Sequence, residues 1–88
     1  MLRESQIETQ LIKRVRECGG DTRKVKWIGR TGAPDRFVML PTKTVWVELK
    51  YPGVKCKPHQ LREHARMRGY LQTVLVIDSF ELIEELVA

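Results

Sequence analysis

Three side chains that could do chemistry together stand near the middle of the sequence. Asp35 follows Pro34 at the entrance of one apolar run, and Glu48 and Lys50 lie near the end of the next. If these runs form a hairpin, Asp35 faces Glu48, and two carboxylates about 5 Å apart repel by roughly 3 kcal/mol at an effective dielectric constant near 20. A bound cation relieves that cost, and oxygen ligands favour magnesium or manganese over zinc. The pair therefore predicts a metal site.

The pattern around these residues predicts the hairpin. The runs 36–40 and 44–50 alternate and carry β-branched and aromatic residues, and they flank Pro41-Thr42-Lys43. Alternation in the second run separates two faces, one with Val45, Val47 and Leu49 and the other with Trp46, Glu48 and Lys50. Glu48 and Lys50 are therefore expected to point the same way.

The remaining segments predict an α/β fold. Capping residues, glycines and prolines mark the ends of these segments. The predicted elements are a helix over about 5–18, a strand over 24–28, the hairpin, a helix over 58–68 that Gly69 ends, a strand over 73–77, and a last helix, capped by Asp78-Ser79, that runs to Val87. This order is αβββαβ followed by a C-terminal helix. The strand–helix–strand crossover implies one parallel pair in an otherwise antiparallel, central mixed sheet flanked by helices.

The ordered set Gly32-Ala33-Pro34-Asp35, Glu48-Leu49-Lys50 and Gln60 resembles the VRR-NUC branch of the PD-(D/E)xK nuclease superfamily. The resemblance extends from Ser5-Gln6-Ile7-Glu8 to Val74-Leu75-Val76-Ile77-Asp78, which is nearly the whole chain. It implies a restriction-endonuclease-like fold in one domain over residues 1–88, in a minimal stand-alone member such as phages and bacteria encode. The implied activity is Mg²⁺- or Mn²⁺-dependent hydrolysis of DNA by an endonuclease, selective for branched or junction DNA in replication or repair.

The resemblance also implies a role for each motif residue. Asp35 and Glu48 would be metal ligands, aided by the Leu49 carbonyl. Lys50 would position the attacking water and stabilise charge on the phosphate. Gln60 matches a helix glutamine that lies close to that lysine and to the scissile phosphate. The catalytic set implied in this way is Asp35, Glu48, Lys50 and Gln60.

Glu8 has two interpretations. The resemblance matches it to a first-helix acid that binds metal directly or through water. Its position on a helical face with Leu11, Ile12 and Val15 is unusual for a carboxylate and fits that role. In a capping box, however, Glu8 would reach back to the Ser5 amide. The sequence leaves both interpretations open.

The other candidates also have purely structural interpretations. Asp35 could be a turn aspartate after proline, Glu48 and Lys50 a solvated strand face, and Gln60 an exposed residue of a first helical turn. For the aromatic and imidazole side chains the structural interpretation is the expected one. Trp27 and Trp46 are expected to pack within the protein, and His59 and His64, five positions apart, to lie at the surface.

Charge favours a polyanionic partner. The 88-residue chain is 42% hydrophobic and 31% charged, which suits one small globular domain. Its net charge is +5, and residues 78–88 hold four acids and no Lys or Arg, so residues 1–77 carry +9. Such a basic body indicates nucleic acid, and DNA is the partner that the resemblance implies. The loop residues expected to follow its backbone are Arg30, Arg36, Lys55 and Lys57.

The sequence also allows two functions that are not enzymatic. A catalytically inactive nuclease-fold module could bind nucleic acid without turnover, although it would gain nothing from acids that face phosphates. A small interaction protein would leave its acids scattered. The clustering of Asp35, Glu48 and Lys50 favours the enzyme over both.

Compartment follows from cysteine usage and hydropathy. Cys18 and Cys56 have neither disulfide-framework nor zinc-ligand spacing, which fits a reducing compartment. The longest apolar run, 73–77, is far shorter than the ~18–20 residues that a membrane span needs, and the start of the sequence lacks a signal peptide's apolar stretch. These features predict the cytoplasm, and the resemblance implies a bacterial or phage-infected cell.

The C-terminal helix predicts a homodimer. Phe80, Ile83 and Val87 span one sector and Leu82 and Leu86 the adjoining one, together about 160° against the ~100° that one core-facing stripe needs. Part of this face would then need a second chain. In the alternative, the two leucines pack against the first helix and the protein is a monomer.

Overall fold

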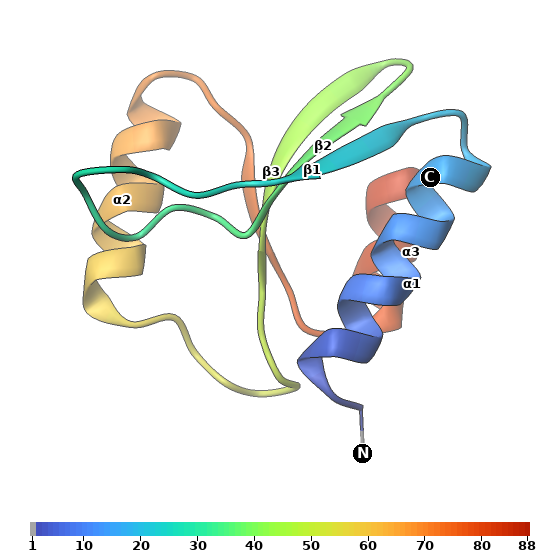
Figure 1. Ribbon diagram of the computed structural model, residues 1–88, viewed down its shortest axis with the longest axis horizontal. Helices are drawn as coiled ribbons and strands as arrows, with labels where there is room; N and C mark the ends of the chain where they lie inside the picture. The colour runs from blue at the N-terminus through green and yellow to red at the C-terminus, as the bar shows by residue number, and fades with distance from the viewer. Residues whose placement is uncertain (1) are drawn as a thin grey trace.

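A four-stranded mixed sheet with helices on both faces forms the protein (Figure 1). The computed structural model describes residues 2–88. Its elements are α1 (Glu4–Glu17), β1 (Asp21–Lys24), β2 (Arg36–Leu40), β3 (Lys43–Leu49), α2 (Pro58–Gly69), β4 (Val74–Ile77) and α3 (Phe80–Val87). The strands lie in the order β1-β2-β3-β4; β1, β2 and β3 pair antiparallel, and β3 and β4 pair parallel across the α2 crossover. The predicted α/β class and element order are confirmed.

The apolar core lies on one face of the sheet, beneath α1 and α3, while α2 covers the opposite face (Figure 1). Alternation in β3 produces this division, because Val45, Val47 and Leu49 enter the core while the intervening residues face α2. The buried cluster contains Ile7, Leu11, Val15, Val38, Val45, Val47, Leu49, Ile77, Ile83 and Leu86. The second face of the sheet is therefore free to carry polar side chains.

The β2–β3 hairpin positions the acids. Its register pairs Arg36 with Val47 and Leu40 with Lys43, which confirms the hairpin, although the second strand covers Lys43–Leu49 and not 44–50. One step beyond the first of these pairs, the same register sets Asp35 opposite Glu48. The sequence prediction that these carboxylates face each other is confirmed.

The first strand differs from its prediction. It covers Asp21–Lys24 and not 24–28, because pairing with β2 begins directly after Gly20, where a side chain would collide with the Met39 carbonyl. The chain then leaves the sheet. Trp27 packs edge-on against Trp46, with ring centroids 5.7 Å apart, and Ile28 is exposed. The apolar residues that resembled a strand therefore form an irregular loop over the α2 face.

The start of α1 also differs. The helix begins at Glu4 with Arg3 as its N-cap, and the Arg3 backbone N–H donates to Gln6 Oε1 at 2.7 Å. Gln6 takes the third helical position, whereas Ser5 lies inside the helix. The capping-box interpretation of Glu8 is therefore wrong, and its carboxylate is available for another contact.

Most of the wide apolar face of α3 is covered within the chain. Ile83 and Leu86 are buried in the core, and Leu82 and Val87 are partly buried against it. Phe80 stays exposed. Ser79 caps the helix as predicted, because its Oγ accepts the Leu82 N–H at 3.2 Å. In the described part of the chain, no helix has the length and hydropathy to cross a bilayer.

Candidate active site

Asp35 directly precedes β2 and lies at the open end of the hairpin, opposite its turn. Its Oδ2 accepts the backbone N–H of Leu49 at 2.7 Å. This bond fixes the carboxylate against the last residue of β3, directly after Glu48. The Leu49 side chain points into the core, so only its backbone belongs to this site. Its carbonyl remains a predicted metal ligand.

Glu48 is a buried carboxylate with a strongly shifted pKa. The residue is only 2% exposed. Burial, followed by the negative charge of Asp35, raises its pKa to about 7, although Lys50 acts in the opposite direction. Glu48 Oε2 lies 3.5 Å from Lys50 Nζ and accepts a hydrogen bond from Gln60 Nε2 at 3.1 Å. The two strand residues thus point the same way, as predicted.

Gln60 links the first turn of α2 to this carboxylate. Its Oε1 accepts the backbone N–H of Lys57, the N-cap residue, at 2.8 Å, which leaves its Nε2 to donate to Glu48. Pro58 at the start of the helix favours this helical turn. The Gln60 side chain therefore both caps α2 and contacts Glu48.

The Glu8 carboxylate forms an ion pair with Arg36 and does not join Asp35 and Glu48 in a cluster of ligands. Its Oε2 is 2.9 Å from Arg36 Nε, and both side chains are partly buried. Across residues 2–88, no three His, Cys, Asp or Glu side chains form a group that could hold a metal ion. The structure therefore brings together Asp35, Glu48, Lys50 and Gln60 and gives Glu8 a cationic partner.

Sequence reasoning missed a further acid, Glu4. Burial, followed by the charges of Asp35 and Glu8, raises its pKa, while Lys50 lowers it. Glu4 lies one helical turn before Glu8, so the first turn of α1 adds to the negative potential at the site. The spacing of four residues between Glu4 and Glu8 places both on one helical face, and this was the sequence signal that could have identified Glu4.

Sequence reasoning also missed His64. It was expected at the surface but is 0% exposed, on the side of α2 that faces Glu48. Its Nε2 lies 3.8 Å from Glu48 Oε1. The spacing of four residues from Gln60 places both on one helical face, and this was the signal that could have found it.

The loop before Asp35 is fastened to α2 by a buried carboxylate. Glu63 accepts the indole N–H of Trp27 at 2.7 Å and a guanidinium N–H of Arg30 at 2.9 Å. Arg66 adds an ion pair at 3.2 Å. The tryptophan is thus confirmed as a packing residue, and its loop cannot move far without breaking several contacts.

The four predicted DNA-contacting residues differ in their surroundings. Arg30 is paired with Glu63 but more than half exposed, whereas Arg36 is partly buried beside Glu8. Lys55 and Lys57 are exposed in the segment between β3 and α2. Contact with a DNA backbone remains a prediction for all four.

The chemistry of the acid pair fits a divalent cation. The charge of Asp35 helps to raise the pKa of Glu48, which is the cost that a cation removes. Carboxylate oxygens are the ligands that Mg²⁺ and Mn²⁺ prefer. Asp35 and Glu48 are therefore suited to hold such an ion, and Lys50 supplies a separate positive charge.

Two similar proteins identify the family. No family model matches the sequence. A protein of Acyrthosiphon pisum secondary endosymbiont phage 1, named "Putative nuclease p44", is 47% identical over 83 residues, which are 93% of this chain and 89% of the phage protein. A solved structure described as "VRR_NUC domain" superposes with a TM-score of 0.87 at 38% identity, over 96% of this chain and 92% of that one. The chain therefore belongs to the VRR-NUC family of nucleases.

Proposed function

We propose that this nuclease is an endonuclease that hydrolyses DNA phosphodiester bonds with Mg²⁺ or Mn²⁺. The observation that carries the proposal is the pair of facing acids, Asp35 and Glu48, with Lys50 Nζ 3.5 Å from Glu48. A buried carboxylate with a pKa near 7 beside another acid is costly for a purely structural site. The name of the phage relative, a nuclease, supports the same reaction.

Each residue of the site has a defined task in this reaction. Asp35 and Glu48 hold the ion, aided by the Leu49 carbonyl, and the ion supplies Lewis acidity and a lowered pKa for a coordinated water when bound. Lys50 places its ammonium group where negative charge develops on the phosphate and orients the attacking water. Gln60 keeps Glu48 Oε2 in place through its 3.1 Å hydrogen bond.

Glu8 contributes as a further acid from α1, directly or through a water. Its 2.9 Å contact with Arg36 orients the carboxylate before an ion arrives. In this proposal Arg36 contacts a DNA phosphate from its position beside Glu8.

The substrate that we propose is branched or junction DNA in the cytoplasm of a bacterial or phage-infected cell. The exposed cations Arg30, Lys55 and Lys57 contact the phosphate backbone on either side of the site. They lie on two separate loops, β1–β2 and β3–α2, and so can contact two arms of a branched duplex. The overall charge of +5 favours association with DNA before any specific contact forms.

Incubation with DNA tests the proposal. Plasmid, plain duplex, flap and four-way junction substrates are each mixed with the protein and magnesium, manganese or a chelator. Cleavage of internal bonds with metal and none with chelator supports the enzyme, and faster cleavage of branched substrates supports the selectivity. Binding without cleavage under every metal condition would leave an inactive DNA-binding module. Glu48→Gln, purified in parallel, reports contaminating nucleases.

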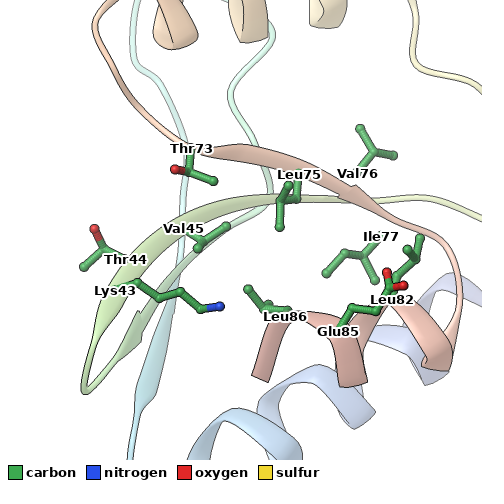
Figure 2. Close-up of a pocket in the computed structure, with 10 residues that line it drawn as sticks. All are labelled: Lys43, Thr44, Val45, Thr73, Leu75, Val76, Ile77, Leu82, Glu85 and Leu86. Atoms are coloured by element: carbon green, nitrogen blue, oxygen red, sulfur yellow. The ribbon is translucent and has the colours of Figure 1, made fainter. Parts of the chain in front are cut away.

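We also propose that two chains associate through an apolar groove beside the edge strand β4 (Figure 2). Its volume is about 250 Å³. The lining residues come from β3, β4 and α3 and are Lys43, Thr44, Val45, Thr73, Leu75, Val76, Ile77, Leu82, Glu85 and Leu86. Lys43 and Glu85 give the lining one charge of each sign, so a two-fold contact can pair them between copies. Such a homodimer would hold two active sites in a fixed relation.

A further inference from the structure

His64 is buried without a hydrogen-bonding partner. The residue is 0% exposed, and in the described part of the chain neither Nδ1 nor Nε2 has a partner. Buried polar groups are nearly always paired because an unpaired one loses its bonds to water. An apolar side chain of similar size would fill the same space without that cost, so packing alone does not account for an imidazole here.

A carboxylate oxygen close to this imidazole is also unpaired. Glu48 Oε1 is buried and has no hydrogen-bonding partner among residues 2–88, and it lies 3.8 Å from His64 Nε2. The other oxygen, Oε2, is shared by Gln60 and Lys50. The two oxygens of Glu48 therefore have separate neighbours, with the histidine on one side and the polar residues of the site on the other.

We propose that His64 is a positioning residue for Glu48, whose Oε1 it holds through Nε2–H so that Oε2 stays directed toward Lys50 and Gln60. The present separation exceeds the ~3.2 Å limit of a good N–H···O bond by about 0.6 Å, so a small rotation of the carboxylate completes the bond. The bond needs only a proton on Nε2, which both the neutral and the charged imidazole can carry. Its effect on catalysis rests on the proposed function of Glu48.

Fixing one carboxylate oxygen restricts rotation of the whole group. A ligand that is already oriented binds its ion more tightly, and losing a partner behind a ligand usually costs 10–100-fold in metal affinity or activity. His64 stands on α2, whereas Glu48 stands on β3, so the contact also joins two elements of the site. His64 thus belongs to the site, although neither the motif nor the strand pattern indicates it.

Three substitutions of His64 distinguish the contributions of its two ring nitrogens. In His64→Gln the amide nitrogen takes the place of Nε2, in His64→Asn it takes the place of Nδ1, and in His64→Leu no donor remains. Met67→Ala serves as the control, because Met67 is buried one turn later on α2 and loses packing without losing a polar contact. Mn²⁺ affinity is measured for each folded variant by calorimetric titration, and cleavage is measured at saturating Mn²⁺.

We expect His64→Leu and His64→Asn to weaken Mn²⁺ binding by at least about 10-fold. His64→Gln should stay within about 3-fold of the unchanged protein, and Met67→Ala should lower the melting temperature without this loss of affinity. Affinity in His64→Leu equal to that of the unchanged protein would overturn the proposal. So would a His64→Gln variant as impaired as His64→Leu, or a matching loss in Met67→Ala.

A second measurement needs no metal and no DNA. Thermal unfolding in chelator is compared for His64→Leu, Glu48→Leu and the double variant. If His64 holds Glu48, His64→Leu lowers the melting temperature much less when Glu48 is already absent. Equal shifts in both backgrounds would refute the contact. Absence of metal binding and cleavage in the unchanged protein would instead refute the proposed function, while the unfolding comparison still decides the role of His64.

Discussion

At the scale of single residues, Glu48 shows how this site combines strand geometry with an unfavourable charge. Alternation along β3 directs it away from the apolar core, yet α2 covers that face and removes the side chain from water. The same carboxylate lies opposite Asp35 and within reach of Lys50. Its high pKa results first from burial and then from the charge of Asp35, against the opposing effect of Lys50.

Removing one functional group at a time should abolish most cleavage. We expect Asp35→Asn, Glu48→Gln and Lys50→Ala each to reduce the cleavage rate at least about 100-fold, because groups that stabilise developing charge usually contribute on that scale. DNA binding, measured by fluorescence anisotropy, should survive. Lys13→Ala, an exposed lysine on α1, is the matched control for Lys50→Ala. Cleavage near the unchanged rate in any one variant would remove that residue from the mechanism.

Stability without metal should depend on pH through Glu48. Its pKa in the folded protein is about 7, whereas the ordinary value is 4.5, so the folded state binds more protons between these two values. The free energy of unfolding should therefore fall as pH rises from about 4.5 to 7, by a few kcal/mol at most. Melting in chelator at pH 5, 6, 7 and 8 measures this decline.

Glu48→Gln is the control for the pH effect, since glutamine does not titrate. The difference between the two proteins isolates the contribution of Glu48 from that of any other group that titrates between pH 5 and 8. Parallel melting profiles for both proteins would show that Glu48 is ionised throughout this range.

Part of this site could be identified from residue types in the sequence, whereas the rest could be identified only from burial and contacts in the folded structure. Asp35, Glu48 and Lys50 could be selected from the sequence because strand alternation and hairpin register are short-range rules. For His64 the helical spacing from Gln60 indicates only its face of α2, because its burial depends on how closely α2 approaches the sheet. The same limit applies to Glu8, whose contact with Arg36 joins residues from separate elements.

At the scale of elements, the β1–β2 loop is the part that local patterns described least well. Val25, Trp27 and Ile28 have strand-forming side chains, but tertiary contacts use them differently: Trp27 bonds to Glu63 on α2, and Ile28 faces solvent. The hairpin, α2, β4 and α3 were predictable to within a residue or two because their turns and caps are local. The loop's course depends on a helix more than thirty residues later in the chain.

Gly32 is a point where the backbone of this loop approaches α2 closely. Its φ is +91°, and a Cβ there would lie 2.8 Å from both Glu63 Cβ and the His59 carbonyl oxygen. We expect Gly32→Ala to cost about 2 to 4 kcal/mol of stability, from backbone strain and overpacking together. Since Asp35 follows three residues later, Mn²⁺ affinity should fall as well. Chemical denaturation and calorimetry measure the two effects.

Gly29→Ala provides a comparison within the same loop. Gly29 has a φ of +84° but open space around its Cβ position, so its replacement adds strain without a collision. We expect it to cost about 1 to 2 kcal/mol and to leave Mn²⁺ affinity unchanged. Equal effects of the two alanines on affinity would show that the contact with α2 does not position Asp35.

At the scale of the whole molecule, ion binding should be visible as added stability. An ion that binds the folded site and not the unfolded chain should raise the melting temperature on the order of 10 °C at a manganese concentration 100 times its dissociation constant. Differential scanning fluorimetry with millimolar Mn²⁺ measures the shift, and the Asp35→Asn, Glu48→Gln double variant should show none. A melting curve of the unchanged protein that ignores manganese would argue against the site.

The oligomeric state is the second property of the whole molecule that can be tested. We expect light scattering at micromolar concentration to give about twice the 10.3 kDa mass of one chain. Leu75→Arg should yield monomers, because Leu75 lines the groove beside β4 and is 36% exposed, so its replacement costs the fold little. A mass of one chain at every concentration would instead refute the homodimer and the role of the groove beside β4.

The division of the sheet into two faces has a consequence for how such a nuclease can evolve. The buried apolar cluster draws on α1, α3 and the strands, whereas α2 and the loops that precede β2 and α2 contribute no member to it among residues 2–88. Substitutions that change which DNA shape is accepted can therefore accumulate on the α2 face while selection for foldability acts mainly on the other. Related enzymes should accordingly diverge fastest in 51–57, and a new specificity can arise there before stability limits it.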